Sequence, residues 1–219
     1  QIHRSAEAAL KAMGESPARF IRRFDPARDL ARLQHVVHRF NSGFDLALLC
    51  HLLHQAIAAA GSLQAFFLKG YDPAHDDIKP VLTSFVERTL SLDVSPFYPS
   101  GLLPAKAGVR FFLPSPAQGS ACKRLNLFLR WMVRRGDAID FGIWTGVSPA
   151  KLIVPLDTHV ARIARQLGLT AIKQPNWRMA KEVTGRLRAF DPEDPVKYDF
   201  ALCRLGVLKQ PIPDRGSIY

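Results

Sequence analysis

The sequence predicts an all-α protein, and three observations support that fold class. Apolar residues recur at helical spacing along most of the chain. Regular strand-like alternation is missing, and Leu152–Leu156 is the only short β-like run. The chain has 219 residues, of which 47% are hydrophobic, so it can form one large domain or two small lobes around a buried core. We therefore expect about eight helices.

Five apolar stripes mark expected helices, and two irregular stretches interrupt them. The stripes run over Leu30–Phe40, Ile78–Val86, Val160–Leu167, Ala180–Phe190 and Val196–Gly206. Ser95–Ser120 is rich in proline and predicts a loop around at most one short turn, and Asp137–Leu156 leads from one helix to the next. We expect a single domain of two helical lobes over residues 1–209 and a flexible tail over residues 210–219.

Composition excludes several classes of protein. The three cysteines lie far apart, which excludes a disulfide scaffold and a four-cysteine cluster. No apolar run approaches the ~20 residues needed to cross a bilayer, and no secretory signal is recognisable. The histidine pairs His35/His38 and His51/His54 lack a complete ligand set. We expect a cytoplasmic monomer without metal or cofactor.

Positive charge is concentrated in one part of the chain. The formal net charge is +11, which points to a polyanionic partner. Val94–Gly136 contains no acidic residue but seven basic ones, namely Lys106, Arg110, Lys123, Arg124, Arg130, Arg134 and Arg135. A solvated helix face is the alternative, but in so basic a chain the cluster predicts phosphate contact without sequence readout. Arg124, Arg130 and Arg134 are our candidates.

Lys123 is the first residue that can carry chemistry. Ser120 is expected to cap a helix over Ala121–Arg135, which places Lys123 in the first turn. There the helix dipole, together with partial burial, disfavours the charged ammonium and leaves some free amine. Such a lysine is a candidate nucleophile for imine chemistry. The alternative is an ordinary surface lysine.

Asp157 is the second candidate. It stands where the extended run Leu152–Leu156 meets the helix that begins at Thr158. It is therefore a natural helix cap, and capping alone would explain it. A carboxylate at a helix start stays anionic, which also suits the stabilisation of a developing cation.

The segment from Ile153 to Leu169, with its Pro155-Leu156-Asp157-Thr158-His159 core, resembles the signature of helix-hairpin-helix DNA glycosylases. In that superfamily a similar stretch opens a helix with the catalytic aspartate, and a catalytic lysine starts an earlier helix. The gap between Lys123 and Asp157 resembles that of the archaeal 8-oxoguanine glycosylases. Lys123–Asn126 and Asp194–Leu202 are similar to blocks of an uncharacterised bacterial family. The resemblance spans roughly Gln118–Leu208.

The resemblance implies a DNA repair enzyme of the bacterial nucleoid that flips and excises a damaged base from double-stranded DNA. Lys123 would form a Schiff base, which permits AP-lyase activity, and Asp157 would support the cationic transition state. An oxidised purine such as 8-oxoguanine is the expected lesion. Asp199 and Cys203, one helical turn apart, and Trp144 are expected to face the flipped base. For Asp199 the alternative is a surface aspartate beside a packed cysteine.

The sequence also departs from the pattern of that superfamily. The hairpin is degenerate, because only Gly119 precedes Lys123 where a glycine-rich turn is usual, although Gly119 and Ser120 can still present backbone N–H groups to a phosphate. The iron–sulfur cysteines of endonuclease III relatives are absent, and the resemblance implies N-terminal helices that we expect to be missing from a chain that begins at Gln1. Two alternatives therefore stay open: a monofunctional glycosylase that uses water, and a non-catalytic helical module that binds DNA or RNA.

Overall fold

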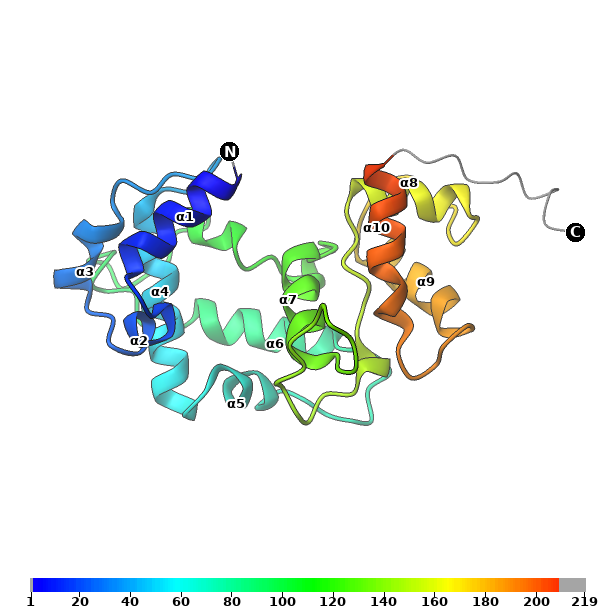
Figure 1. Ribbon diagram of the computed structural model, residues 1–219. Helices are drawn as coiled ribbons and strands as arrows, with labels where there is room; N and C mark the ends of the chain where they lie inside the picture. The colour runs from blue at the N-terminus through cyan, green and yellow to red at the C-terminus, as the bar shows by residue number, and fades with distance from the viewer. Residues whose placement is uncertain (1, 209–219) are drawn as a thin grey trace, which may run out of the picture. The chain divides into compact units, whose positions relative to one another are not determined.

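The computed structural model describes residues 2–208 and confirms that the chain is all-α. No strand forms within these residues, where a single isolated bridge joins His38 and Asn41. Ten α-helices and four short 3₁₀ helices follow one another in the described part of the chain (Figure 1). The expected tail over residues 210–219, together with residue 209, lies outside the described residues.

The helices have the following bounds: α1 Ile2–Met13, α2 Pro17–Arg22, α3 Pro26–Leu33, α4 Gly43–Ala60, α5 Leu63–Leu68, α6 Lys79–Leu90, η1 Gly108–Phe111, η2 Pro116–Gln118, α7 Lys123–Val133, η3 Pro149–Lys151, α8 Thr158–Gln166, α9 Trp177–Arg188, η4 Pro195–Tyr198 and α10 Asp199–Val207. The chain divides into two compact units. The first contains the residues up to Tyr71 together with Val81–Pro114, and the second contains Asp72–Pro80 and the residues from Ser115 onward.

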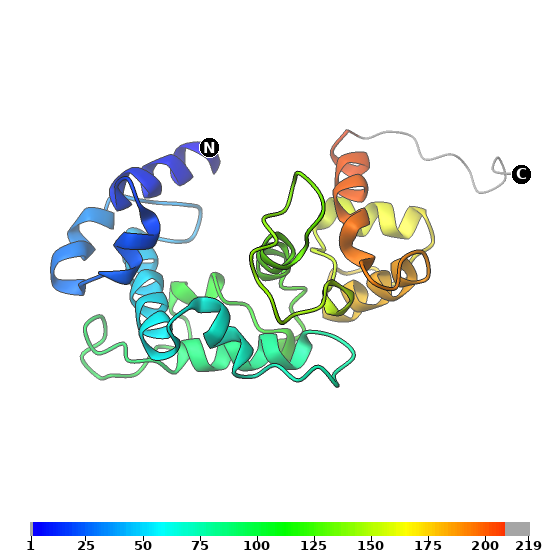
Figure 2. The same cartoon turned by 60° about the horizontal axis from the view of Figure 1, so that its bottom comes forward.

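Helix α4 is the core helix of the first unit. It packs against α2, α3 and α5, and Figure 2 shows it (light blue to cyan) beside α2 and α3. A capping box fixes its start, because Ser42 and Asp45 each accept a hydrogen bond from the backbone N–H of the other. Gly43 is required there, since a Cβ would lie 1.9 Å from the carbonyl oxygen of Leu33. Of the described helices, α4 alone has the length and hydropathy of a membrane span, a test that buried core helices also pass.

The second unit contains α7 to α10, and the contact between α8 and α10 organises it. These two helices cross closely, as Figure 1 shows for the yellow and red ribbons. The approach depends on Gly206, where a Cβ would lie 2.7 Å from the Cβ of His159. The extended run Leu152–Leu156 is fully buried beneath these helices and forms no strand. The Val154 N–H donates instead to the hydroxyl of Thr184 in α9, at 3.0 Å.

The predicted stripes agree with the helices except at their ends. Ile78–Val86 lies almost wholly within α6, and its apolar residues are buried. The first stripe is wrong beyond Leu33, where α3 ends, because Arg39 adopts a left-handed φ of 55° and Phe40 is 83% exposed. Phe190 likewise lies beyond α9 and is exposed. Ser95–Ser120 contains two short 3₁₀ helices, η1 and η2, rather than one turn.

Candidate functional site: a lysine–aspartate pair at two helix starts

Helix α7 begins at Lys123, two residues later than the sequence predicts. Cys122 occupies the cap position with a left-handed φ of 48°, so no helix can include Ala121. Ser120 therefore does not cap the helix; its hydroxyl accepts a hydrogen bond from the Cys122 N–H at 3.2 Å and stabilises the turn before it. Asn126 further braces the start, because its amide donates to the Ala121 carbonyl at 3.0 Å. Lys123 is consequently the first residue of the helix.

Asp157 caps α8, as its sequence position predicts. Its Oδ1 accepts a hydrogen bond from the Val160 N–H at 2.8 Å. Its second oxygen, Oδ2, lies 3.1 Å from the ammonium Nζ of Lys123. The pair joins the starts of α7 and α8 within the second unit. The side chains of Lys123 and Asp157 are 46% and 16% exposed, so both reach solvent.

The Asp157 carboxylate is stabilised in its ionised form. Partial burial acts to raise its pKa, but the hydrogen bonds from Val160 and Lys123 outweigh burial and lower the pKa below its usual range. Asp157 is therefore anionic at neutral pH. A fixed anion that faces a cation and solvent can stabilise positive charge that develops on a substrate.

Asp199 is the first residue of α10 and lies close enough to sense the charges of Asp157 and Lys123. It is buried rather than exposed, with 4% of the residue accessible, which excludes the surface aspartate considered above. Its Oδ2 accepts a hydrogen bond from Nη1 of Arg130, whereas Oδ1 is buried with no partner. Burial raises the pKa of Asp199 to about 6, although the positive charge of Arg130 opposes this rise.

Cys203 follows Asp199 one turn later on α10 and is half-buried. Burial raises the pKa of its thiol, and the carboxylates of Asp157 and Asp199 raise it further. The thiol is therefore protonated at neutral pH and is not a thiolate nucleophile. Four residues that the resemblance assigns to one site thus lie within reach of one another's charges at the first turns of α7, α8 and α10, namely Lys123, Asp157, Asp199 and Cys203.

The comparisons with known proteins place the chain in a family without assigning it an activity. A family model described as "Protein of unknown function (DUF2400)" matches residues 1–208. The chain belongs to this family. No curated protein and no solved structure matches it. What this DUF2400 protein does must therefore be argued from its side chains.

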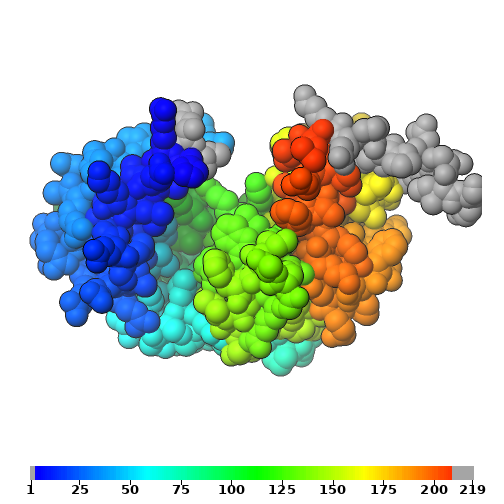
Figure 3. All heavy atoms as spheres, in the orientation of Figure 1, coloured from blue at the N-terminus to red at the C-terminus, as the bar shows by residue number. Residues whose placement is uncertain are grey.

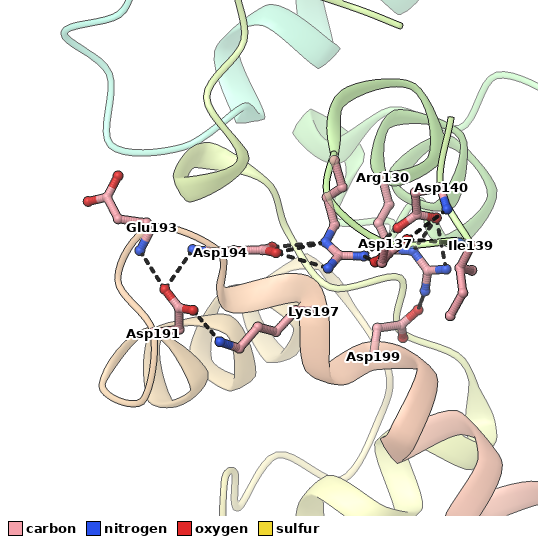
Figure 4. Close-up of polar contacts among 10 residues, drawn as sticks. Arg130, Asp137, Ile139, Asp140, Asp191, Glu193, Asp194, Lys197 and Asp199 are labelled. Atoms are coloured by element: carbon pink, nitrogen blue, oxygen red, sulfur yellow. Dashed lines mark hydrogen bonds and ion pairs between the residues drawn. The ribbon is translucent and has the colours of Figure 1, made fainter. Parts of the chain in front are cut away.

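Arg130 and Arg134 hold the second unit of the DUF2400 chain together from inside, which corrects the prediction that they contact DNA. They are only 4% and 6% exposed. Arg130 pairs with Asp199 and with Asp140, and Figure 4 shows these residues together with Asp137 and Asp194. Arg134 makes a two-pronged contact with Asp194 at 2.9–3.0 Å and also pairs with Asp137 and Asp140. With their guanidinium groups engaged by carboxylates, neither arginine can be assigned to a DNA phosphate.

The acidic partners of these arginines could not be predicted from the basic segment, because they lie outside Val94–Gly136. Asp137 and Asp140 follow the basic window directly, and Asp194 and Asp199 come about 60 residues later in the chain. Asp194 stands at the cap position of η4, but its side chain makes no cap hydrogen bond and contacts Arg134 instead. Lys106 and Arg110 belong to the first unit, so the basic window is divided between the two units.

Trp144 and Gly119 also differ from their predicted roles. Trp144 is 7% exposed and packs edge-on against Phe128 of α7 with ring centroids 5.4 Å apart, so it offers no face to a flipped base. The Gly119 N–H donates to the Pro116 carbonyl at 3.1 Å and is thus committed within η2. Arg124 is exposed beside Lys123, and Ser120 is half-buried. These two residues stay candidates for phosphate contact.

The described residues contain no group of three or more histidine, cysteine and acidic side chains that could hold a metal ion. His54 is engaged through Nδ1 with the Ile21 carbonyl at 3.1 Å. His51 is buried between the rings of Phe24 and Phe97, and burial lowers its pKa. Both histidines of this pair therefore belong to the packing of the first unit.

Proposed function

We propose that this protein is a DNA glycosylase that flips a damaged base out of duplex DNA and cleaves its N-glycosidic bond. We propose further that its all-α fold is a helix-hairpin-helix glycosylase-like fold with a degenerate hairpin. The observation that carries it is the 3.1 Å pair of Lys123 and Asp157 at the starts of two helices. A lysine nucleophile and a fixed carboxylate within one proton-transfer distance are what the chemistry requires.

The reaction begins when the flipped nucleotide places its sugar carbon C1′ against Lys123, because that carbon cannot be reached inside the base stack. Lys123 first passes one proton to the adjacent Asp157 carboxylate, and its neutral amine then forms a bond to C1′. The glycosidic C1′–N bond breaks with its electron pair passing to the base, and the departing base nitrogen takes the proton from Asp157. A second proton passes from the bound nitrogen to O4′ as the C1′–O4′ bond breaks, which yields a Schiff base. Loss of a C2′ proton to water then expels the 3′ phosphate with the electron pair of its C3′–O bond.

Asp157 has a second task in this scheme. As the base departs and takes the proton, positive charge develops on the sugar, and Asp157, anionic again, stabilises it. The lowered pKa of Asp157 supports this task, because a carboxyl group with a low pKa gives up its proton readily. Its hydrogen bond to the Val160 N–H holds the carboxylate in place, so little reorganisation is needed during the reaction.

We assign Asp199 and Cys203 to the base-binding side of the site, and 8-oxoguanine is our preferred lesion. The unpartnered Oδ1 of Asp199 supports this assignment, because it is an acceptor without a donor and an oxidised purine carries an additional N–H. That oxygen is buried, so the base reaches it only if neighbouring side chains move. The preference for the lesion rests on this acceptor and on the family resemblance.

A monofunctional glycosylase is the second candidate, and the exposure of the pair favours it. Because solvent reaches both Lys123 and Asp157, a water molecule bound between them and C1′ can serve as the nucleophile. Lys123 would then orient the reaction without forming a covalent bond. A non-catalytic module that binds nucleic acid needs neither residue in a shared site.

Borohydride trapping tests these readings. The protein is incubated with duplexes that each carry one modified base, in the presence of borohydride, and covalent protein–DNA adducts are separated by denaturing electrophoresis. We expect an adduct on the cognate lesion and none with Lys123→Gln. Lys181→Gln is the matched control, because Lys181 is also a half-exposed lysine, paired with Asp77 at 2.9 Å, and should form the adduct normally.

The possible outcomes separate the candidates. Base release at full rate by Lys123→Gln would make water the nucleophile. Absence of base release from every duplex, with DNA binding intact, would favour the non-catalytic module. Arg124→Ala should weaken binding to every sequence alike and reduce the salt slope by about 1, as expected for one phosphate contact.

A further inference from the structure

The first unit contains a hollow lined by four arginines, remote in sequence from Lys123 and Asp157. It has a volume of about 560 Å³ and forms where the end of α1 meets α2 and α3. Arg19, Arg23, Arg28 and Arg32 line it, and Glu15 is the one carboxylate in the lining. A volume of this size lies within the range of small-molecule sites. Figure 3 shows the side chains of these N-terminal helices in shades of blue.

A buried carboxylate beneath the hollow organises two of its arginines. Asp29 is fully buried and accepts hydrogen bonds from Nε and Nη2 of Arg28 at 3.0 Å and 2.7 Å. Arg32 lies 3.5 Å from the same carboxylate and stacks over the Phe20 ring at 5.0 Å from its centroid. The arginine side chains are nevertheless 59% and 47% exposed, so their remaining donors face solvent.

The charge of the hollow is not cancelled by its surroundings. Each of the four arginines contributes one guanidinium group, the cationic side chain that cannot be deprotonated in proteins. Glu15, the buried Asp29 and Asp25, whose charge acts on Arg28, offset three of these charges, which leaves an excess of one positive charge. Arg19 and Arg23 are exposed on α2 and just beyond it, where the backbone turn at Arg23 is held by Arg28 through a 2.7 Å hydrogen bond to the Arg23 carbonyl. The first unit therefore holds a fixed concave cationic surface.

The geometry points to a phosphate-binding site in this hollow, with phosphate esters as its ligands. Planar guanidinium groups with several donors suit the oxygens of phosphate. Phe20 is only 7% exposed and covered by Arg32, so the hollow has no aromatic face on which a base could stack. Recognition is therefore of phosphate and not of sequence. This inference goes beyond the proposed function and does not depend on Lys123 or Asp157.

A pair of charge-reversal variants tests the site against net charge alone. Arg19→Glu/Arg23→Glu changes the hollow, whereas Lys11→Glu/Arg22→Glu makes the same charge change at exposed residues of α1 and α2 that do not line it. Binding of a labelled, lesion-free duplex is measured at several salt concentrations. We expect the first variant to weaken binding at least about tenfold and to reduce the salt slope by about 2, because two phosphate contacts are lost. The control should change binding less than about threefold.

A second probe identifies the source of the phosphate. Pyrophosphate and a nucleoside triphosphate are titrated into the full chain, and binding is followed by calorimetry. If the hollow variant loses binding to these small phosphates while duplex binding is unchanged, the ligand is a free phosphate compound and the site stands. If both double variants weaken binding equally, or if neither probe is affected, the inference is overturned.

Two further measurements distinguish loss of the site from misfolding, and the hollow from the Lys123–Asp157 site. Arg19→Gln/Arg23→Gln removes the charges without reversing them, and should show the same selective loss if charge reversal disturbs folding. Borohydride trapping with each variant at saturating DNA separates the two proposals, because a hollow variant should still form the adduct. Lys123→Gln should conversely bind the duplex and pyrophosphate like the unchanged protein.

Discussion

The second unit contains two sets of ion pairs that look alike in sequence and differ in their surroundings. Lys123 and Asp157 meet at the ends of two helices, and both reach solvent. Arg130 and Arg134 meet their carboxylates inside the unit, where their side chains are 5% and 8% exposed and that of Asp140 is fully buried. Buried charges must keep their partners, whereas the exposed pair can exchange partners for substrate at little cost. We therefore assign chemistry to the first set and folding to the second.

The largest expected effect is a loss of stability when the buried ion pairs are disrupted. Arg134→Ala leaves the carboxylate of Asp194 without its cation and that of Asp140 with Arg130 alone, and removal of one partner from a buried pair costs about 3–5 kcal/mol. Urea unfolding at neutral pH measures this loss. The neighbouring Arg135→Ala is the control. Arg135 is exposed and donates hydrogen bonds to the backbone carbonyls of Gly142 and Trp144, so its loss should cost about 1 kcal/mol or less. Equal, small losses for both variants would contradict a structural role for the buried set.

The next effect concerns the exposed set and is kinetic. Asp157→Asn keeps a helix cap, since asparagine caps as well as aspartate, but removes the negative charge that faces the sugar. We expect base release to slow by about 10²–10³-fold, as for the loss of one electrostatic stabiliser. Single-turnover assays on the cognate lesion measure this rate. Asp77→Asn, which alters the lysine–aspartate pair with Lys181, should leave the rate unchanged, and an equal loss in both would refute the assignment of Asp157.

The contrast between the two sets also explains what the sequence could predict. The cap position of Asp157 follows from local pattern, because an extended apolar run meets a helix there, and the helix stripes follow from periodicity. The exact start of α7 does not follow from local pattern. It is set by the left-handed conformation of Cys122, which cysteine rarely adopts. The prediction that Lys123 and Asp157 share one site came from the family resemblance and not from local pattern.

The burial of polar side chains could not be predicted from the sequence. Arg130 and Arg134 read as an exposed basic face because their carboxylates are distant along the chain, and long-range pairing leaves no periodic signal. Trp144 stood in a long loop, which favoured a binding role, yet that loop is tied to α7 by the hydrogen bond from the Trp144 N–H to the Met132 carbonyl at 2.7 Å. The arginine hollow of the first unit gave no motif at all.

A pH titration of stability sharpens the comparison at the residue that joins the two sets. Asp199 pairs with Arg130 and senses Asp157 and Lys123, and burial raises its pKa to about 6 from about 3.9 in the unfolded chain. The folded protein thus holds this proton more tightly, so the contribution of Asp199 to stability is full below about pH 4 and is lost as the pH rises through about 6.

Asp199→Asn removes that titration and reveals it by difference. The free energy of unfolding of the unchanged protein, relative to the variant, should fall by about 1–3 kcal/mol between pH 4 and pH 7. Urea unfolding across this range measures it. The opposite contribution of Asp157, whose pKa is lowered and whose stabilisation is lost as the pH falls below about 4, is shared by both proteins. A difference that is constant or rises with pH would contradict the raised pKa of Asp199.

The smallest expected effect is on the stability of the exposed set itself. Lys123→Gln removes a half-exposed ion pair, and such pairs contribute about 0–1 kcal/mol because water solvates both charges well. Asp157 retains its hydrogen bond from the Val160 N–H in the variant, so α8 stays capped. Urea unfolding should therefore place the variant within about 1 kcal/mol of the unchanged protein. A loss above about 2 kcal/mol would make the pair a structural contact, and the absence of a borohydride adduct from Lys123→Gln would then no longer identify a nucleophile.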